Sequence, residues 1–245
     1  MKLIFIRHAE PDYENNTLTE KGFKEAEALG LFYKDLKVDA IYSSPLNRAY
    51  FTCEAFAKYH PEIEIQKVDE LVEFNHEARF YPPYDKENAH VTWDFLPRYF
   101  VERKEMLSIN SYLDSKWFEK TTVKEAYLKD VKVFDDILEK HGYKRSEKGY
   151  YEAIKANKDT IVFVTHLGKM AVLLSHILHI PHVLIAQYFC ALPSSVTVVV
   201  TEEREEKIAQ FRCLRFGDLS HLAVANIDES FMARWAETFD SKERH

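Results

Sequence analysis

Two histidines in this chain of 245 residues follow directly after short apolar runs. Arg7 and His8 come after residues 3–6, and His166 comes after residues 160–165. An arginine can bind two oxygens of a phosphate or carboxylate at once. That positive charge disfavours protonation of a neighbouring histidine, which leaves a neutral, nucleophilic imidazole. The residue types therefore indicate anion binding combined with nucleophilic chemistry, with a solvated strand end as the alternative.

Arg48 is a third candidate, because it lies near the expected start of a helix. Ser44 and Pro45 are typical of such a start, with serine as the N-cap and proline as the first helical residue. The N–H groups and the dipole of a helix N-terminus attract anions. A cation in the first turn opposes that dipole, and a bound anion would compensate. An ordinary exposed arginine is the alternative reading.

The elements that would position these residues alternate between strands and helices. We expect strands at 3–6, 39–43, 63–68 and 160–165, with one helix capped by Thr17 or Thr19 and another that ends near Tyr59. Such alternation is typical of a parallel α/β sheet, whose ligands bind beyond the carboxyl ends of the strands. We therefore expect Arg7, His8, Arg48 and His166 at one edge of one sheet.

The alternation stops after residue 73. Residues 75–157 hold no convincing buried strand, and coarse helices fit 84–107, 123–141 and 147–156. We interpret this segment as a helical insertion, or cap, within a single domain that covers residues 1–245. Farther along, a helix is expected at 167–180, and two β-rich runs at 195–201 and 207–214 predict an antiparallel hairpin at the sheet edge. The predicted fold class is α/β, with three layers (α/β/α) around a mostly parallel sheet.

The composition excludes several classes of partner. The formal net charge of −7 argues against a protein that binds duplex nucleic acid. No apolar run reaches the roughly 20 residues of a membrane span. The three cysteines lack metal-binding spacing and indicate a reducing compartment, so we expect a cytoplasmic protein. His176, His179 and His182 have no carboxylate or cysteine in register, so we expect no bound metal.

Four ordered motifs carry a resemblance to a known family. They are Ile6-Arg7-His8-Ala9-Glu10, Leu18-Thr19-Glu20-Lys21-Gly22, Tyr42-Ser43-Ser44-Pro45-Leu46-Asn47-Arg48-Ala49 and Val164-Thr165-His166-Leu167-Gly168. In order and spacing they resemble the histidine phosphatase superfamily, in its phosphoglycerate-mutase-like branch. Residues 192–197 and the pair His221-Leu222 resemble the C-terminal portion of that branch. The resemblance covers roughly residues 1–73 and 160–222 and omits the segment between them.

The resemblance implies a metal-independent phosphomonoester hydrolase that needs no cofactor. His8 would be the nucleophile that becomes phosphohistidine. Arg7, Arg48 and the catalytic His166 would hold the phosphate oxygens and stabilise the charge of the transition state. Leu167 stands where the family commonly has glycine, and its backbone N–H would still bind phosphate. The alternatives are a phosphoglycerate-mutase-type isomerase and a non-catalytic module that binds a phosphorylated ligand.

The general acid that the resemblance implies is Glu73. It stands in the string Leu71-Val72-Glu73, and Glu70 is the close alternative. A plain surface carboxylate is the other reading. The family commonly continues with glycine and a Trp-Glu-Gly stretch, whereas this chain continues with Phe74-Asn75-His76-Glu77-Ala78-Arg79. We therefore expect the loop beyond the acid to have a different shape.

The segment after Glu73 is expected to set the substrate, a phosphorylated small molecule. Asn15, Arg79 and Trp93 are the candidates for substrate binding. Further aromatic and basic residues could line the same pocket or, alternatively, could pack a cap: Tyr81, Tyr84, Arg98, Arg103 and Trp117. The edge strands and the aromatic segment would also suit a homodimer.

Overall fold

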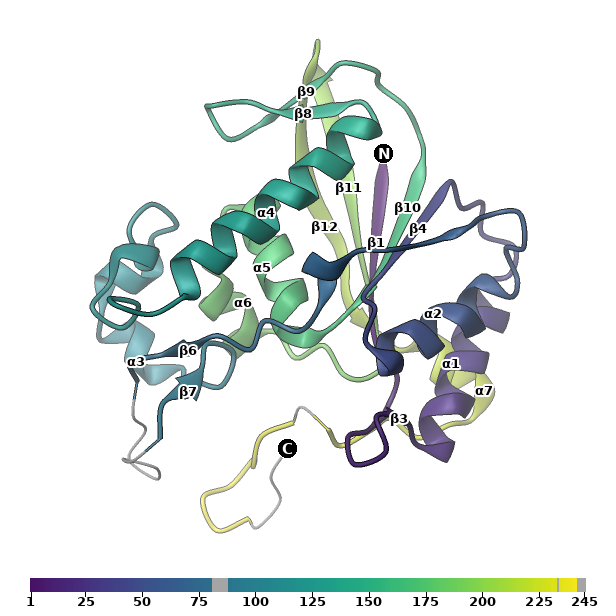
Figure 1. Cartoon of the computed structure of the whole chain (residues 1–245), viewed down its shortest axis with the longest axis horizontal. Helices are drawn as coiled ribbons and strands as arrows, with labels where there is room; N and C mark the ends of the chain where they lie inside the picture. The colour runs from purple at the N-terminus through teal and green to yellow at the C-terminus, as the bar shows by residue number, and fades with distance from the viewer. Residues whose placement is uncertain (81–87, 233, 242–245) are drawn as a thin grey trace.

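A mixed sheet of eight strands forms the centre of the computed structural model, which describes residues 1–80, 88–232 and 234–241 (Figure 1). Its strand order is β5-β4-β10-β1-β11-β12-β9-β8. The first four strands pair in parallel and the others pair antiparallel. These strands are β1 (Lys2–Arg7), β4 (Ala40–Ser43), β5 (Ile65–Lys67), β8 (Tyr143–Arg145), β9 (Tyr151–Ala153), β10 (Thr160–Thr165), β11 (Val196–Glu205) and β12 (Ile208–Asp218). The predicted α/β class, with a parallel core, is confirmed.

Strand register brings the ends of the parallel strands level. Arg7 of β1 pairs with Thr165 of β10, and Val164 pairs with Ser43 of β4. The next residue after each strand is therefore His8, His166 or Ser44. All three connections leave the same edge of the sheet, as expected for parallel strands.

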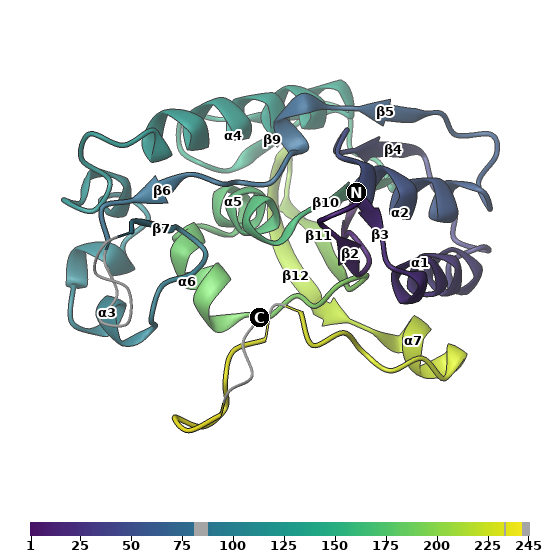
Figure 2. The ribbon, with the colours of Figure 1, turned by 60° about the horizontal axis from the view of Figure 1, so that its bottom comes forward.

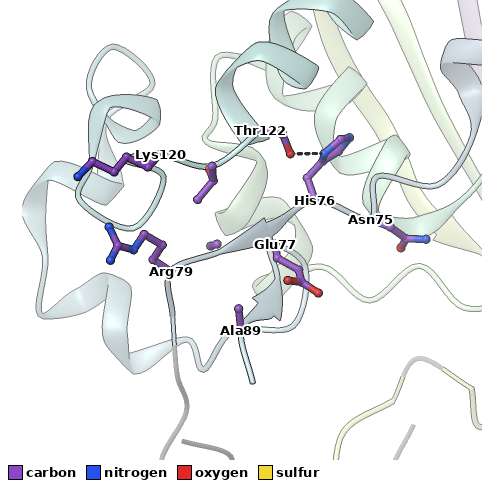
Figure 3. Close-up of a pocket in the computed structure, with 9 residues that line it drawn as sticks. Asn75, His76, Glu77, Arg79, Ala89, Lys120 and Thr122 are labelled. Carbon is purple, nitrogen blue, oxygen red and sulfur yellow. Dashed lines mark hydrogen bonds between the residues drawn. The ribbon is translucent and has the colours of Figure 1, made fainter. Parts of the chain in front are cut away.

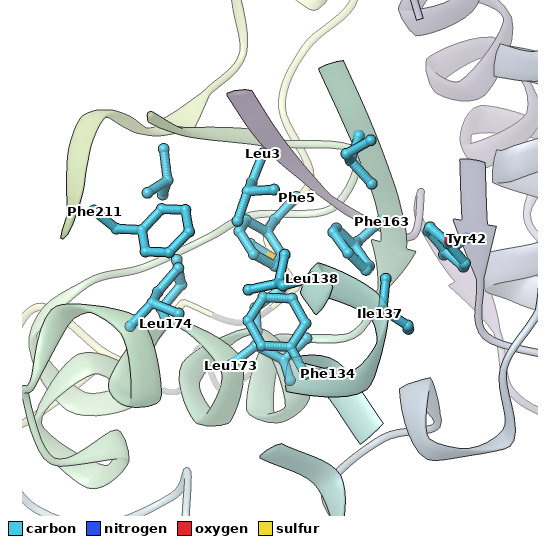
Figure 4. Close-up of a cluster of buried hydrophobic side chains, with 14 of the residues drawn as sticks. Leu3, Phe5, Tyr42, Phe134, Ile137, Leu138, Phe163, Leu173, Leu174 and Phe211 are labelled. Atoms are coloured by element: carbon cyan, nitrogen blue, oxygen red, sulfur yellow. The ribbon is translucent and has the colours of Figure 1, made fainter. Parts of the chain in front are cut away.

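Alternate residues of β1 point to opposite faces of the sheet, so both faces carry a helical layer. Leu3 and Phe5 pack toward α4 and α5, where Phe134 and Leu173 meet them (Figure 4). Ile4 and Ile6 belong to a second cluster on the other face, with residues of α1 and α2. This period of two is the geometry of a strand that is buried on both sides.

The two helical layers lie on opposite sides of the sheet (Figures 1 and 2). One layer contains α1 (Glu20–Phe32), α2 (Asn47–Ala57) and α7 (Ser220–Ala225), and the other contains α4 (Val123–Lys140), α5 (Leu167–Leu178) and α6 (His182–Tyr188). In the described ranges, no helix has both the length and the apolar composition needed to cross a bilayer.

The structure shows which residues cap the N-termini of α1 and α2. Thr19 caps α1, since its hydroxyl accepts from the N–H of Gly22 at 2.9 Å. Thr17, the other cap considered, lies in the short strand β3 (Thr17–Leu18), which pairs with β2 (Pro11–Asp12). The prediction of Ser44 as the cap of α2 is wrong, because that helix begins at Asn47. The Ser44 hydroxyl lies instead 2.8 Å from Nε2 of His166.

The first helix predicted in the segment 75–157, at 84–107, is mostly wrong. Residues 81–87 lie outside the described ranges, and the rest holds only short elements. Proline at position 97 cannot continue a helix from the preceding residues, and it begins the four-residue helix α3. The elements described before position 141 in this segment are β6 (Glu77–Ala78), β7 (His90–Val91), α3 (Arg98–Val101), η2 (Lys104–Leu107), η3 (Tyr112–Asp114) and the long helix α4, which was predicted.

The helix predicted at 147–156 is also wrong. Strands β8 and β9 form a hairpin there, and Tyr143 and Tyr151 bury one face of it. Gly149 takes a φ of +89° in the turn, a conformation that glycine adopts without strain. This hairpin pairs with β12 and forms the sheet edge. The hairpin of β11 and β12 was predicted correctly, but it lies inside the sheet instead of at the edge.

Candidate active site

The predicted histidines lie side by side at the carboxyl edge of the sheet. The ring centroids of His8 and His166 are 5.1 Å apart. The N–H of His8 donates to the carbonyl of Thr165 at 2.9 Å, so the backbone of one strand holds the other. Both side chains are buried, with exposed fractions of 1% and 0%. Two residues separated by 157 positions therefore share one centre.

His8 presents a lone pair on one defined nitrogen. Its Nδ1 lies 2.8 Å from the carbonyl oxygen of Ala9, and a carbonyl can only accept, so Nδ1 carries the hydrogen. Burial, followed by the charge of Arg7, lowers the pKa of His8 well below its ordinary value. The ring is therefore neutral at pH 7, with its lone pair on Nε2. That is the state a nucleophilic imidazole requires.

His166 is also neutral. Burial lowers its pKa well below the ordinary value, and the neighbouring imidazole of His8 and the charge of Arg48 lower it further. Its Nδ1 has no hydrogen-bond partner among the described residues, and neither have Nε of Arg7 or Nε of Arg48. Both arginine nitrogens are donors that lose hydration on burial without gaining a protein partner. Such unsatisfied donors fit a site that binds an anion.

Each of the two arginines is held by its own contacts. Nη1 of Arg7 donates to the carbonyl of Ala191 at 2.7 Å. Arg48 is the second residue of α2, and its guanidinium carbon lies 5.3 Å from the ring centre of Tyr13. The hydroxyl of Thr52 donates to the carbonyl of Arg48 and accepts from the N–H of Ala9. Thr52 therefore ties the start of α2 to the loop after β1.

Sequence reasoning did not assign roles to several hydroxyl residues around this centre. Thr165 Oγ1 donates to the carbonyl of Leu71 at 2.6 Å, which anchors the segment that leads to Glu73. Ser194 takes a φ of +60°, donates its N–H to the carbonyl of His8 and bonds through Oγ to His221. A non-glycine residue in that conformation stores backbone strain. Both residues lie in or beside the quoted motifs, which was the available signal.

Glu73 lies at the N-terminus of α5. Its Oε1 accepts hydrogen bonds from the N–H of Phe74 at 2.8 Å and of Lys169 at 3.1 Å. Its negative charge also raises the pKa of Arg7, against the larger lowering by burial. Glu70, the alternative acid, instead pairs with Lys129 of α4 at 3.1 Å. Glu73 therefore bonds to the start of α5, the helix that follows His166, whereas Glu70 pairs with α4.

Gly168 allows Trp93 and Glu73 to approach the start of α5. A Cβ atom at position 168 would lie 2.5 Å from Cδ1 of Trp93 and 2.9 Å from Oε1 of Glu73. No side chain fits there without displacing one of them. Leu167, the first residue of α5, has its side chain in the core, and no side chain caps its helix. Its backbone N–H belongs to a helix N-terminus, which favours anions.

The other substrate-binding candidates lie in two different places. Asn15 is exposed and bonds to Asp12, in a loop that also contacts Asn47 at the start of α2. Arg79 lines a surface pocket of about 390 Å³ together with His76 and Lys120 (Figure 3), and neither His8 nor His166 lines that pocket. Three further candidates pack with aromatic rings, as the alternative reading expected: Arg98, Arg103 and Trp117. The other two, Tyr81 and Tyr84, lie outside the described ranges.

Comparison with known proteins extends these observations. Residues 3–93 match the histidine phosphatase superfamily, branch 1. Phosphoserine phosphatase 1 of Hydrogenobacter thermophilus is 34% identical over 85 residues, which make up 31% of this chain and 40% of that protein. A 2,3-bisphosphoglycerate-dependent phosphoglycerate mutase of Thermoplasma acidophilum is 38% identical over 64 residues, or 22% of this chain and 32% of the mutase. The chain thus matches less than half the length of both curated relatives.

Solved structures resemble far more of the chain. A mutant phosphoserine phosphatase of Entamoeba histolytica, in complex with phosphoserine, matches 90% of this chain and 98% of its own length, with a TM-score of 0.58 and 18% identity. A mycobacterial glucosyl-3-phosphoglycerate phosphatase matches 88% and 98%, with a TM-score of 0.54 and 15% identity. At such identities the likeness establishes the fold. Only about a tenth of the chain lies outside the aligned region. The shared fold therefore includes most of the segment 75–157.

Residues 3–93 of this α/β protein thus resemble the histidine phosphatase superfamily, and the likeness of the rest of the chain to solved phosphatases is one of fold.

Proposed function

We propose that this protein is a metal-independent phosphoric monoester hydrolase that works through a phosphohistidine. One observation carries the proposal: a neutral, buried His8 with its lone pair on Nε2 lies beside His166 and two arginines with unsatisfied donors. A phosphoryl group bound there would meet positive charge on its oxygens and a nucleophile at phosphorus. No cofactor enters the scheme.

In the first step, Nε2 of His8 forms a bond to phosphorus while the ester P–O bond breaks. Glu73 gives its proton to the leaving alcohol oxygen. In the second step, the Glu73 carboxylate takes a proton from water, and the water oxygen attacks phosphorus. The P–N bond breaks, its electron pair returns to Nε2, and phosphate leaves. Dividing hydrolysis into two such transfers is covalent catalysis assisted by a general acid and base.

The proposed substrate is a small phosphorylated metabolite. The bond to Oε1 of Glu73 and the contact of Trp93 with Gly168 place an acid and an aromatic ring beside the same helix start. An aromatic ring beside the start of α5 fits a compact leaving group better than a polymeric one. The relatives act on, or were solved with, compact phosphoesters such as phosphoserine. We also propose a cytoplasmic location and a single domain that includes residues 75–157.

The test is a panel of sugar phosphates, nucleotides and phosphorylated hydroxy acids, assayed in the presence of a chelator. We expect release of inorganic phosphate from the wild-type protein and none above background from His8→Ala. Acid-labile incorporation of phosphate at His8 would accompany turnover. Isomerisation of 3-phosphoglycerate without phosphate release would favour a mutase instead. Phosphate binding without a phosphoenzyme would favour a binding module.

A further inference from the structure

A buried ion pair beside Glu73 has no part in the proposed steps. Lys169, in the first turn of α5, pairs with Asp130 of α4. Their side chains are only 2% and 9% exposed. Burying two charges costs solvation free energy that their attraction repays only in part. The pair therefore contributes little net free energy to folding. Its position next to the proposed acid suggests a different role.

Lys169 touches the Glu73 segment in two ways. Its backbone N–H donates to Oε1 of Glu73 at 3.1 Å, and its ammonium lies 5.2 Å from the ring centre of Phe74. The N–H of Phe74 donates to the same Oε1 at 2.8 Å. The lysine side chain thus fastens Phe74 to α4 through Asp130, and Phe74 in turn holds the carboxyl group.

These contacts select the oxygen of Glu73 that carries the proton. Oε1 accepts two amide N–H groups, which occupy its lone pairs. The proton of the neutral acid is therefore carried by Oε2. A general acid must hold its proton within hydrogen-bond reach of the leaving oxygen, and a misplacement of about 1 Å can cost roughly 100-fold in rate.

We infer that Lys169, held in place by Asp130, is a positioning residue for Glu73 in proton transfer to the leaving group. The inference rests on the proposed function. It assigns a role to α4, because Asp130 lies beyond the residues 3–93 that match the family. The long helix α4 of the intervening segment would then support catalysis and not only cover the core.

The test compares two substrates that differ in their need for an acid. The leaving group of 4-nitrophenyl phosphate departs without a proton, whereas that of glycerol 2-phosphate requires one. Glu73→Gln should lose activity mainly on glycerol 2-phosphate. We expect Lys169→Met, and the double variant Lys169→Met/Asp130→Asn, to lose roughly 10- to 100-fold in kcat/KM on glycerol 2-phosphate. On 4-nitrophenyl phosphate we expect a loss of only a few-fold.

The double variant guards against misfolding, since it leaves no unpaired charge in the core. Lys129→Met is the matched control, because it removes an exposed ion pair between the same helix and Glu70 and should leave both activities unchanged. Combining Lys169→Met with Glu73→Gln should add little to the loss caused by Glu73→Gln alone, because both changes remove one function.

Three outcomes would overturn the inference. Equal losses on both substrates would mean that the pair has only a structural role. Leaving-group dependence in Glu73→Gln but not in the Lys169 variants would contradict the inference and leave the proposed function intact. Absence of that dependence in Glu73→Gln would remove Glu73 as the acid and the inference with it, while loss of turnover in His8→Ala would still support the nucleophile.

Discussion

The ends of the parallel strands and the segment that follows Glu73 are built differently. At the strand ends, His8, His166 and Arg7 are buried, and the backbones of Arg7 and His8 bond to neighbouring strands. The following segment has short strands and 3-10 turns, packed by rings such as Phe80, Phe95 and Trp117. Reactive groups need a rigid support, whereas loops can vary the contacts to a substrate. From this difference we propose that the first region carries the chemistry and the second selects the substrate.

The sharpest test of that assignment is His8→Ala. We expect kcat to fall by roughly 1000-fold or more on every phosphomonoester, because the variant removes the nucleophile itself. Phosphate release and trapping of the phosphoenzyme are the measurements, with circular dichroism to confirm the fold. Wild-type turnover in the variant would contradict the assignment of chemistry to the strand ends.

Gly168→Ala tests the contact between the two regions. The new methyl group would lie 2.5 Å from Trp93 and 2.9 Å from Glu73, so one of them must move. We expect kcat/KM to fall roughly 10- to 100-fold, since the proposed acid loses its alignment. Gly142→Ala, in a distant turn, is the control for the general cost of replacing a glycine. The melting temperature of this variant should fall, but its activity per folded molecule should stay the same. Full activity in Gly168→Ala would show that the close approach is unimportant.

Trp93→Ala tests the second region directly. Loss of the ring beside Gly168 should raise KM and lower kcat/KM by about 10-fold, with a size that depends on the leaving group. Trp93→Phe, which keeps an aromatic ring, should lose less. The same loss on every member of a substrate panel would argue that Trp93 only packs the core and does not select the substrate.

The smallest effect is expected from Glu25→Gln, which concerns stability. Glu25 is buried behind the strand end, where it accepts from the N–H of Glu10 at 2.8 Å. Burial raises the pKa of Glu25 from 4.5 to about 7. Between those values the folded protein holds a proton that the unfolded chain has lost, so stability falls as pH rises through this window. The glutamine variant does not titrate, and its stability relative to wild type should therefore increase from pH 5 to pH 8.

Urea unfolding at the two pH values measures this effect, and Glu14→Gln, at an exposed position, is the matched control. The same pH slope in Glu25→Gln and in the wild type would contradict the assignment of a buried, protonated Glu25. The slope would also show how firmly the loop after His8 is held, because Glu25 binds the backbone of Glu10 in that loop.

Local patterns predicted the elements wherever the chain alternates between apolar strands and amphipathic helices. The parallel strands, α1, α4, α5 and the β11–β12 hairpin were all anticipated, since their periodicity follows from burial. The errors at 84–107 and 147–156 arose where aromatic side chains find partners far away in sequence. Tyr143 and Tyr151 bury one face of a hairpin that pairs with β12, a strand more than 50 residues later in the sequence. Position in the sheet, such as edge or interior, depends on pairings that no local window contains.

The sequence by itself determined the residue types of the site: Arg7, His8, Arg48 and His166 each follow a strand or begin a helix, and parallel strands end at one edge. The tertiary structure decided the rest. It bonds Glu73 to the start of α5 and pairs Glu70 with Lys129, and it places Arg79 in a surface pocket that neither His8 nor His166 lines. It also set the tautomer of His8. The strands and the residues at their ends are encoded in local periodicity, whereas the direction of a carboxylate in an irregular loop depends on distant backbone groups that donate to it.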